Sequence, residues 1–278
     1  MTHTGSQSPT AAIIMAAGRG SRMKGYAGNK TVLPLQPESS IFSGQRPIIA
    51  HLIDNLPPGP RTIVVNHCQE DVMAATRDTG ADFCHQPKLN GTGGAILAAG
   101  DFVAAQPVSN VVITMGDVPF VKRQTYDALV SGLDAHDLMI LGFSPADKKQ
   151  YGLLEIDRGR VNKITEWKYW KDYPADRQDN LTICNSGIYA VKKATLVHYL
   201  PILESRPQIV QKEIDGRLTE IEEFFFTDLI EFMVKDGKPV GYHVVEDEFE
   251  TMGVDDATAL EKAQAIYRAS IREGGIPI

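Results

Sequence analysis

The sequence predicts an α/β fold: a mostly parallel, mixed sheet flanked by helices in a Rossmann-like arrangement, with a smaller β-rich lobe. The first observation is the apolar run at 11–17, which lacks alternation and is typical of a strand covered on both faces. The second is the regular exchange of short apolar runs and helical patterns in the first half. Repeated βα units imply a layered sheet with right-handed crossovers. The third is a change of rhythm after Tyr151, where closely spaced strands replace the βα units.

The first half of the chain supplies most of the expected sheet. Ligands of open sheets of this kind bind beyond the carboxyl ends of the strands. We therefore expect a site where Gly18 and the turn at 115–117 follow their strands. The apolar runs predict strands at 11–17, 62–66, 82–85, 111–114 and 138–143, and the helical spacing predicts helices at 47–56, 93–105 and 123–133.

The second half is expected to begin with a β-hairpin that turns at Arg158-Gly159. Thr227 is expected to cap a helix, and Thr258 to open the last helix with a capping box, which then ends at Gly274-Gly275. Residues 206–223 are polar and weakly periodic and receive no assignment. The expected strands are 153–157, 161–166, 183–191 and 240–245, and the expected helices are 193–203, 227–235 and 258–272.

Composition argues against several classes of protein. The formal charge of −7 leaves no broad basic surface, so we expect no nucleic acid partner. No run approaches the roughly 18 apolar residues of a membrane span, so we expect no membrane partner. The three widely spaced cysteines argue against a disulfide framework and fit a reducing cytoplasm. No His/Cys cluster has zinc spacing, and no Gly-x-Ser-x-Gly elbow is present.

The loop after the first strand combines glycine with positive charge. Gly18 and Gly20 can adopt positive φ and let backbone N–H groups approach a ligand. Arg22 and Lys30 bring charge that suits a polyphosphate. The loop lacks the Gly-Lys-Ser/Thr of a Walker loop, and Met23 replaces the third glycine of a dinucleotide fingerprint. Glycines after a strand are also typical of a plain turn, so the later segments decide the interpretation.

Two acidic turns are candidates for a metal site. Asp117 stands at the carboxyl edge of an expected strand, with Gly116 clearing space beside it. Asp255 and Asp256 offer a further carboxylate just before a helix. Magnesium favours one or two carboxylates completed by substrate phosphates and water. The alternatives are an Asx-type turn for Asp117 and a helix N-cap for Asp255 or Asp256, and for Asp256 we favour the cap.

Gln86 follows a strand and precedes a glycine-rich segment at 91–94. Its amide carries both donors and an acceptor, which suits the edge of a nucleobase, and the glycines would let a base approach closely. Thr92 is expected to cap the following helix. The alternative is an ordinary strand–helix loop with a solvated Gln86.

Polar residues beside glycines in the second half suggest a sugar pocket. Glu166 and Asn185 can bond sugar hydroxyls, and Lys168 can meet a phosphate, with Gly152 nearby at a strand end. Each of these residues taken singly is more typical of a surface or a turn.

In chain order, these motifs resemble the sugar-1-phosphate nucleotidyltransferase family, and within it the pyrophosphorylase domains of bacterial bifunctional N-acetylglucosamine-1-phosphate uridyltransferases. The resemblance covers nearly the whole chain, from about 11 to 274. The motifs are Met15-Ala16-Ala17-Gly18-Arg19-Gly20-Ser21-Arg22-Met23, Lys30, Gln86, Gly91-Thr92, Gly116-Asp117-Val118-Pro119, Tyr151-Gly152, Glu166, Asn185-Ser186-Gly187 and Gly253-Val254-Asp255.

The resemblance implies a nucleotide-diphospho-sugar transferase fold. It also implies a reaction in which a sugar 1-phosphate attacks the α-phosphorus of UTP and expels pyrophosphate, with Mg²⁺ as cofactor and N-acetylglucosamine 1-phosphate as the favoured sugar. The residues carried over are Met15, Ala16, Ala17, Gly18 and Gly116 for the nucleoside, Gln86, Gly91 and Thr92 for uracil, Arg22 and Lys30 as catalytic cations at the triphosphate, Gly152, Glu166, Lys168 and Asn185 for the sugar phosphate, and Asp117 and Asp255 for magnesium.

The resemblance further implies a single domain at 11–274 after a disordered start at 1–10. Its expected parts are a nucleotide-binding half at 11–145, a sugar-binding lobe at 146–256 and a C-terminal helix at 257–274. We expect no β-helix acetyltransferase domain. Residues 271–278 resemble the connector that leads into such a domain in the bifunctional enzymes, so the chain is either monofunctional or one domain of a longer product.

Departures from the family pattern leave alternatives open. Asp255 stands where the bifunctional enzymes carry asparagine and related thymidylyltransferases carry aspartate, so dTTP and glucose 1-phosphate remain beside the favoured substrates. The extra residues 24–29 lengthen the loop before Lys30, and Asn29-Lys30 replaces the usual Pro-Lys. Two further alternatives are a non-catalytic subunit that binds a nucleotide sugar and transfer to a non-sugar phospho-alcohol. The oligomeric state is not addressed by the sequence.

Overall fold

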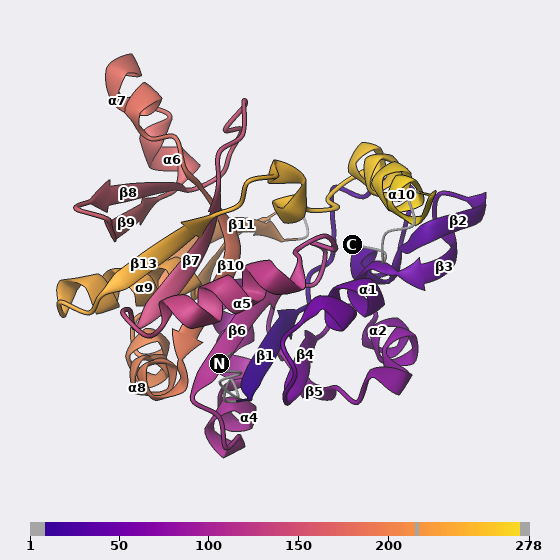
Figure 1. The fold of residues 1–278 in the computed structure, drawn as a ribbon, viewed down its shortest axis with the longest axis horizontal. Helices are drawn as coiled ribbons and strands as arrows, with labels where there is room; N and C mark the ends of the chain where they lie inside the picture. The colour runs from indigo at the N-terminus through magenta and orange to yellow at the C-terminus, as the bar shows by residue number, and fades with distance from the viewer. Residues whose placement is uncertain (1–8, 215–216, 273–278) are drawn as a thin grey trace, which may run out of the picture.

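The computed structural model describes residues 9–214 and 217–272. Their main sheet runs in the order β13-β7-β10-β6-β1-β4-β5, with the hairpin β8–β9 joined to β10 (Figure 1). Neighbouring strands along this order are parallel except at β10, which is antiparallel to both β6 and β7. The strands are β1 (Thr10–Met15), β4 (Arg61–Val65), β5 (Asp82–His85), β6 (Asn110–Met115), β7 (Leu138–Phe143), β8 (Leu153–Asp157), β9 (Arg160–Thr165), β10 (Cys184–Lys192) and β13 (Val240–Val244).

Helices cover both faces of this sheet (Figure 1). One face packs against α1 (Ile48–Asn55), α2 (Gln69–Ala75) and α5 (Arg123–Gly132). The other packs against α3 (Gly91–Ala98), α4 (Gly100–Ala105), α8 (Lys193–Glu204) and α9 (Phe226–Lys235). This arrangement confirms the expected mostly parallel, mixed sheet between helical layers.

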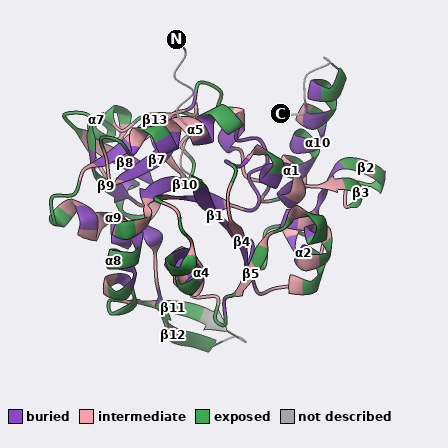
Figure 2. Ribbon diagram, turned by 60° about the horizontal axis from the view of Figure 1, so that its bottom comes forward, coloured by how far each residue is buried: buried purple, intermediate pink, exposed green. Residues whose placement is uncertain are grey.

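Strand β1 shows why its sequence does not alternate. Ile13 packs into the core on the α8 and α9 side, whereas Ile14 packs into the core on the α1 and α5 side, and both are fully buried. A strand buried on both faces has apolar residues at every position. Figure 2 shows β1 in the colour of buried residues.

Smaller elements complete the fold. Helix α10 packs against the hairpin β2–β3 in a third apolar cluster, which also contains Val254. These elements are β2 (Pro34–Ser40), β3 (Ser43–Pro47), α6 (Trp167–Trp170), α7 (Ala175–Asn180), β11 (Gln208–Ile214), β12 (Arg217–Glu223), α10 (Ala257–Arg272) and the 3₁₀ turns η1 (Lys30–Val32), η2 (Arg77–Thr79) and η3 (Glu248–Thr251). None of the helices described is long and apolar enough to span a membrane.

Several local predictions were wrong. The expected helix at 93–105 is two helices that meet at Ala99 and Gly100. Thr227 does not cap α9, whose N-cap position is Phe225 and has no side-chain hydrogen bond. The capping box from Thr258 is also wrong, because the Asp256 Oδ1 accepts the hydrogen bond from Ala259 N at 2.8 Å. The preferred cap role of Asp256 is therefore confirmed.

Other predictions concern the chain ends and the division into lobes. Most of the segment 1–10, which was expected to be disordered, lies outside the described residues, and Thr10 already belongs to β1. The expected helix end at Gly274-Gly275 lies wholly outside them. Strands on both sides of residue 146 belong to one sheet. The division into two halves stays a prediction.

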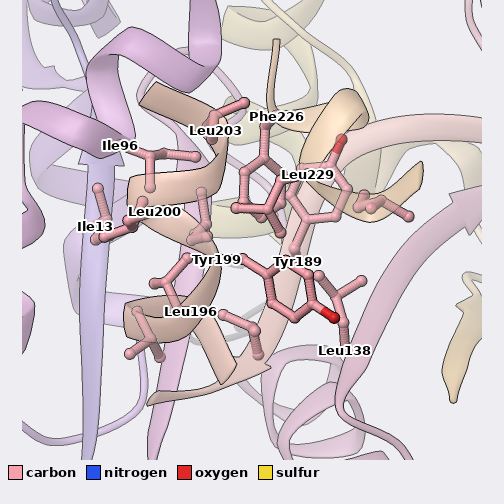
Figure 3. Close-up of a cluster of buried hydrophobic side chains, with 14 of the residues drawn as sticks. Ile13, Ile96, Leu138, Tyr189, Leu196, Tyr199, Leu200, Leu203, Phe226 and Leu229 are labelled. Atoms are coloured by element: carbon pink, nitrogen blue, oxygen red, sulfur yellow. The ribbon is translucent and has the colours of Figure 1, made fainter. Parts of the chain in front are cut away.

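The core between the sheet and α8 and α9 is built around aromatic side chains (Figure 3). Phe226, at the start of α9, is 1% exposed, and its ring centroid lies 4.7 Å from that of Tyr189 on β10. Leu200 and Leu203 of α8 belong to the same cluster. The first turn of α9 is thereby fixed to the sheet.

We expect Phe226→Ala to lower the free energy of unfolding by about 3–5 kcal/mol, because a buried aromatic side chain is lost and a cavity remains. Urea unfolding followed by circular dichroism measures this change. The matched control is Leu218→Ala on β12, whose side chain is 75% exposed and whose loss should change stability by no more than about 0.5 kcal/mol. Equal effects of the two variants would contradict the prediction.

Candidate functional site

A cavity of about 1380 Å³ opens at the carboxyl ends of β1 and β6. This is the edge of the sheet at which the sequence predicts a site. Open parallel sheets bind ligands at this edge because the loops that follow the strands can diverge there. Its lining includes residues 15–22, Lys30, Asn66, 86–92, Met115, Asp117, Lys212, 220–224 and Asp255.

The loop after β1 lines the cavity from Met15 to Arg22, so Met15, Ala16, Ala17 and Gly18 lie where the sequence predicts them. Gly20 has a φ of +59°, the left-handed conformation expected for it, and faces the aliphatic part of the Lys30 side chain. Gly18 does not have a positive φ. No atom lies within 4 Å of a Cβ built at Gly18, so space beside it is open to a ligand.

Four charged side chains from three distant parts of the chain meet in this cavity. The Lys30 Nζ forms an ion pair with the Asp117 Oδ2 and lies 2.5 Å from the Asp255 Oδ1. Burial lowers the pKa of Lys30, but the carboxylates of Asp117 and Asp255 outweigh it, so the pKa is raised overall and the amine is charged. Arg22, with its side chain 75% exposed, reaches the Asp255 Oδ2 at 3.4 Å. The predicted cations and the predicted metal ligands thus form one cluster.

Each acid is fixed by backbone contacts. Asp117 follows β6, where the Gly116 N–H donates to the Met15 carbonyl at 2.9 Å. A Cβ at Gly116 would lie 2.9 Å from that same oxygen, so a side chain there would push the two strand ends apart. The Val254 N–H donates to the Asp117 carbonyl at 2.9 Å, which brings Asp255 alongside. Gly116 therefore shapes the site from behind the cavity lining.

Asn29 positions Lys30. In the sequence, Asn29 stood out only as a departure from the usual Pro-Lys. Its side chain is fully buried and donates to the Ala16 carbonyl at 2.7 Å and the His67 carbonyl at 3.0 Å. Its Oδ1 accepts from the Thr31 N–H at 3.0 Å and caps the turn that begins at Lys30. The extended loop at 24–29 thus ends on a residue that joins Lys30 to the end of β1.

The two carboxylates fit a magnesium ion. Asp117 and Asp255 both contact the amine of Lys30, so their oxygens converge on one small region. The described residues contain no group of three or more His, Cys, Asp or Glu side chains suited to a metal. Two carboxylates with phosphate oxygens are nevertheless a typical magnesium environment, because this ion keeps several non-protein ligands.

Gln86 is buried, not solvated. Its Nε2 donates to the Asn90 Oδ1 at 3.1 Å and to the Gly91 carbonyl at 3.2 Å, so the amide orders the loop that lines the cavity. Gly91 has a φ of +94°, and a Cβ there would collide with the Phe224 carbonyl. Thr92 does not cap α3, because its Oγ1 accepts from the Phe226 N–H at 3.2 Å. Gln86, Gly91 and Thr92 nevertheless lie together at the cavity.

The unassigned segment 206–223 forms the hairpin β11–β12, which supplies one wall of the cavity. Figure 2 shows most of this hairpin in the colour of exposed residues. Phe224, just after it, donates its N–H to the Asn90 carbonyl and accepts from the Gly93 N–H, both at 2.8 Å. Lys212 and Glu223 form an ion pair across the two strands. The dipeptide Asp215-Gly216, typical of a tight hairpin turn, was the sequence signal that could have found this element.

The predicted sugar residues form a second group near the cavity but outside its lining. The Asn185 N–H donates to the Gly152 carbonyl at 2.8 Å, and a Cβ at Gly152 would lie 3.4 Å from the Glu166 carboxylate. The Asn185 Nδ2 donates to the Tyr189 hydroxyl at 2.9 Å. Lys168 lies close enough to Glu166 to lower the pKa of that carboxyl. All four residues are therefore neighbours.

This second group lies close to the acid cluster. Burial raises the pKa of Tyr151, which precedes Gly152, and the carboxylates of Asp255 and Asp117 raise it further. The Tyr151 hydroxyl therefore lies within electrostatic range of the predicted metal ligands.

Burial raises the pKa of Glu166 above its ordinary value of 4.5, an effect that the charge of Lys168 only partly offsets. The charged form of Glu166 is disfavoured in the folded state. The stability that protonated Glu166 contributes below pH 4.5 is therefore lost as the pH rises through the pKa that Glu166 has in the folded protein. We expect Glu166→Gln to gain stability relative to the unmodified protein over this interval. Urea unfolding at a series of pH values measures the difference, and a difference independent of pH would contradict the prediction.

A sequence profile described as the MobA-like NTP transferase domain matches residues 12–175. This chain belongs to that family. A bifunctional protein GlmU from Jannaschia sp. is 30% identical over 277 residues, covering 96% of this chain and 55% of the relative. Another GlmU, from Novosphingobium aromaticivorans, is 29% identical over 267 residues, covering 94% and 53%. The chain thus spans about half the length of these relatives.

A solved structure supports the fold of this NTP transferase domain. It is a Bacillus anthracis protein described as a glucose-1-phosphate thymidylyltransferase, crystallised with sucrose, and it superimposes with a TM-score of 0.64. The sequence identity is 19%, and the match covers 93% of this chain and 95% of the other. The resemblance drawn from the motifs is therefore confirmed at the level of the nucleotidyltransferase family and its fold.

Proposed function

We propose that this protein joins UTP to a sugar 1-phosphate, with N-acetylglucosamine 1-phosphate favoured, to give a UDP-sugar and pyrophosphate. The observation that carries the proposal is the meeting of Lys30, Asp117 and Asp255 in one cavity beside the glycine loop. The GlmU relatives favour this assignment over the alternative, a glucose 1-phosphate uridylyl- or thymidylyltransferase. A cytoplasmic location is part of the proposal.

In this reaction a phosphate oxygen of the sugar 1-phosphate forms a bond to the α-phosphorus of UTP. The bond between the α-phosphorus and the bridging oxygen breaks, and its electron pair leaves with pyrophosphate. Such transfer depends on in-line positioning and on cations that stabilise the developing charge, so no covalent enzyme intermediate is required. The Lys30 side chain is 16% exposed and supplies one of these positive charges. Arg22 supplies another at the cavity rim.

Asp117 and Asp255 would hold the magnesium ion. When bound, this ion neutralises phosphate oxygens and orients the triphosphate. Lys30, paired with both carboxylates, is kept beside that region and is available to the phosphates. Its pKa, raised overall, keeps the amine cationic.

The nucleoside of UTP and the sugar of the sugar 1-phosphate would contact different groups of residues. The loop from Met15 to Gly18 and the Gln86 segment offer backbone groups and an ordered amide for the nucleoside. Glu166 and Asn185, held beside Gly152, offer acceptors and donors for sugar hydroxyls. Their position near the acid cluster suits an attacking phosphate that must reach the α-phosphorus.

The test is a pyrophosphate-release screen of four nucleoside triphosphates against a panel of sugar 1-phosphates and phospho-alcohols, with and without Mg²⁺. We expect magnesium-dependent release with UTP and a hexose 1-phosphate. Preference for dTTP or for glucose 1-phosphate would select the alternative transferase. Pyrophosphate release only with a phospho-alcohol would show that a phospho-alcohol, and not a sugar 1-phosphate, is the acceptor. Binding of a UDP-sugar with no release under any condition would identify a non-catalytic binding protein and reject the proposal.

A further inference from the structure

Glu250 is a buried carboxylate outside the cavity lining. It lies in η3, five residues before Asp255, and is 7% exposed. Its Oε2 accepts from the Thr125 hydroxyl at 2.6 Å and from the Lys122 N–H at 3.3 Å, and its Oε1 accepts from the Lys122 Nζ at 3.1 Å. Burying a carboxylate is costly unless it is paired and hydrogen-bonded, and here it is both.

The partners of Glu250 lie at the start of a helix that packs on the main sheet. Lys122 is the N-cap residue of α5, and Thr125 lies in its first turn. The next residue, Tyr126, shares a 3.0 Å hydrogen bond between its hydroxyl and that of Thr114 on β6, and both side chains are fully buried. Because Asp117 lies two residues after the end of β6, Glu250 is tied through α5 to the strand that leads to Asp117.

A second tether holds the other end of the same segment. The Val254 N–H donates to the Asp117 carbonyl at 2.9 Å, and the Val254 side chain is fully buried. The chain from Glu250 to Val254 is therefore fixed at both ends to the strand of Asp117 or to the helix packed on it. Asp255 follows immediately and reaches Lys30.

We infer that Glu250 is a positioning residue for Asp255, a role that rests on the proposed function. It sets the distance between the carboxylates of Asp117 and Asp255 without touching substrate. The two acids lie far apart in sequence, so their spacing depends on how segment 250–254 is anchored. A loss of this anchor displaces Asp255, and a displacement of about 1 Å is enough to lower turnover by roughly 100-fold.

Glu250→Gln tests the inference, because glutamine keeps the volume and removes the ion pair with Lys122. We expect the Val254 amide to exchange with deuterium about tenfold faster, with exchange in α8 unchanged. We also expect kcat for pyrophosphate release to fall by about tenfold to 100-fold while the KM for UTP changes less. The matched control is Asp137→Asn, which breaks the 2.9 Å ion pair between Asp137 and Lys192. This pair lies where β7 begins and β10 ends, at the edge of the main sheet opposite the cavity.

Three outcomes would overturn the inference: unchanged exchange at Val254, faster exchange spread equally over the chain, or an equal fall of kcat in Asp137→Asn. The last two would show a general loss of stability. The exchange measurement needs no substrate, and pyrophosphate release by the unmodified protein decides the proposed function separately. Failure of the proposed function and failure of the Glu250 inference are therefore distinguishable.

Discussion

Replacing Lys30 with alanine is expected to lower kcat/KM for pyrophosphate release by about 100-fold to 1000-fold, the effect typical of removing one preorganised group that stabilises transition-state charge. The Lys30 amine is largely buried and is held by Asp117 and Asp255, so it is oriented before substrate binds. Water would not replace a fixed cation at this position. Steady-state kinetics with UTP and the best sugar 1-phosphate from the screen measures the loss.

The matched control for Lys30→Ala is Lys24→Ala, which removes an exposed lysine of the same loop that does not line the cavity. We expect its kcat/KM to stay within about twofold of the unmodified protein, because exposed charges are screened by solvent and salt. Thermal unfolding of both variants checks that the fold is intact. A folded Lys30→Ala protein with at least half of the original kcat/KM would rule out the catalytic role of Lys30.

Asp117→Asn is expected to lower kcat by about 100-fold or more and to raise the magnesium concentration needed for half-maximal rate. Asparagine keeps the shape of the side chain but loses the negative charge that pairs with Lys30. A metal ion prefers a carboxylate to an amide because the charge offsets the cost of shedding its water. Pyrophosphate release measured over a magnesium titration separates the two effects.

The control for Asp117→Asn is Asp256→Ala, which removes an acid next to Asp255. Asp256 caps α10 through Ala259 N, so we expect a loss of about 1 kcal/mol in stability and little change in kcat. If Asp117→Asn kept its kcat and its magnesium dependence, the role of Asp117 in holding the metal would be wrong. A similar loss of kcat in both variants would point to a general effect of acidic charge.

Local patterns predicted most of the main sheet and its helices. The strand at 138–143 was predicted at the residues where β7 lies, because a doubly covered strand has an uninterrupted apolar run. The strand at 82–85 was also predicted at the residues where β5 lies, although β5 is at the edge of the sheet and both of its end residues are exposed. The Thr227 cap of α9 and the Thr258 capping box of α10 were predicted wrongly, whereas the cap role of Asp256 was confirmed. Helix starts depend on which side chain the surrounding structure turns toward the free N–H groups, and a Thr-x-x-Glu pattern by itself does not determine that.

The hairpin β11–β12 was missed for a different reason. Its strands project from the main sheet and carry mostly polar residues, so they lack the apolar run that marked the core strands. Only the Asp215-Gly216 dipeptide signalled a turn in this segment. Its contribution of one cavity wall depends on the backbone hydrogen bonds between Phe224 and the loop at 90–93, which no local pattern records.

The sequence by itself determined the class of the site: a buried strand that ends in a glycine loop, cations within reach of that loop, and acids after two glycine-led turns. Those are local properties, set by residue type and spacing. Only the tertiary structure decided that Lys30 stands between Asp117 and Asp255, that Asn29 joins it to the end of β1, and that Glu250 anchors the segment before Asp255. These contacts join residues far apart in the chain, and packing between elements creates them, so the periodicity of any single segment cannot reveal them.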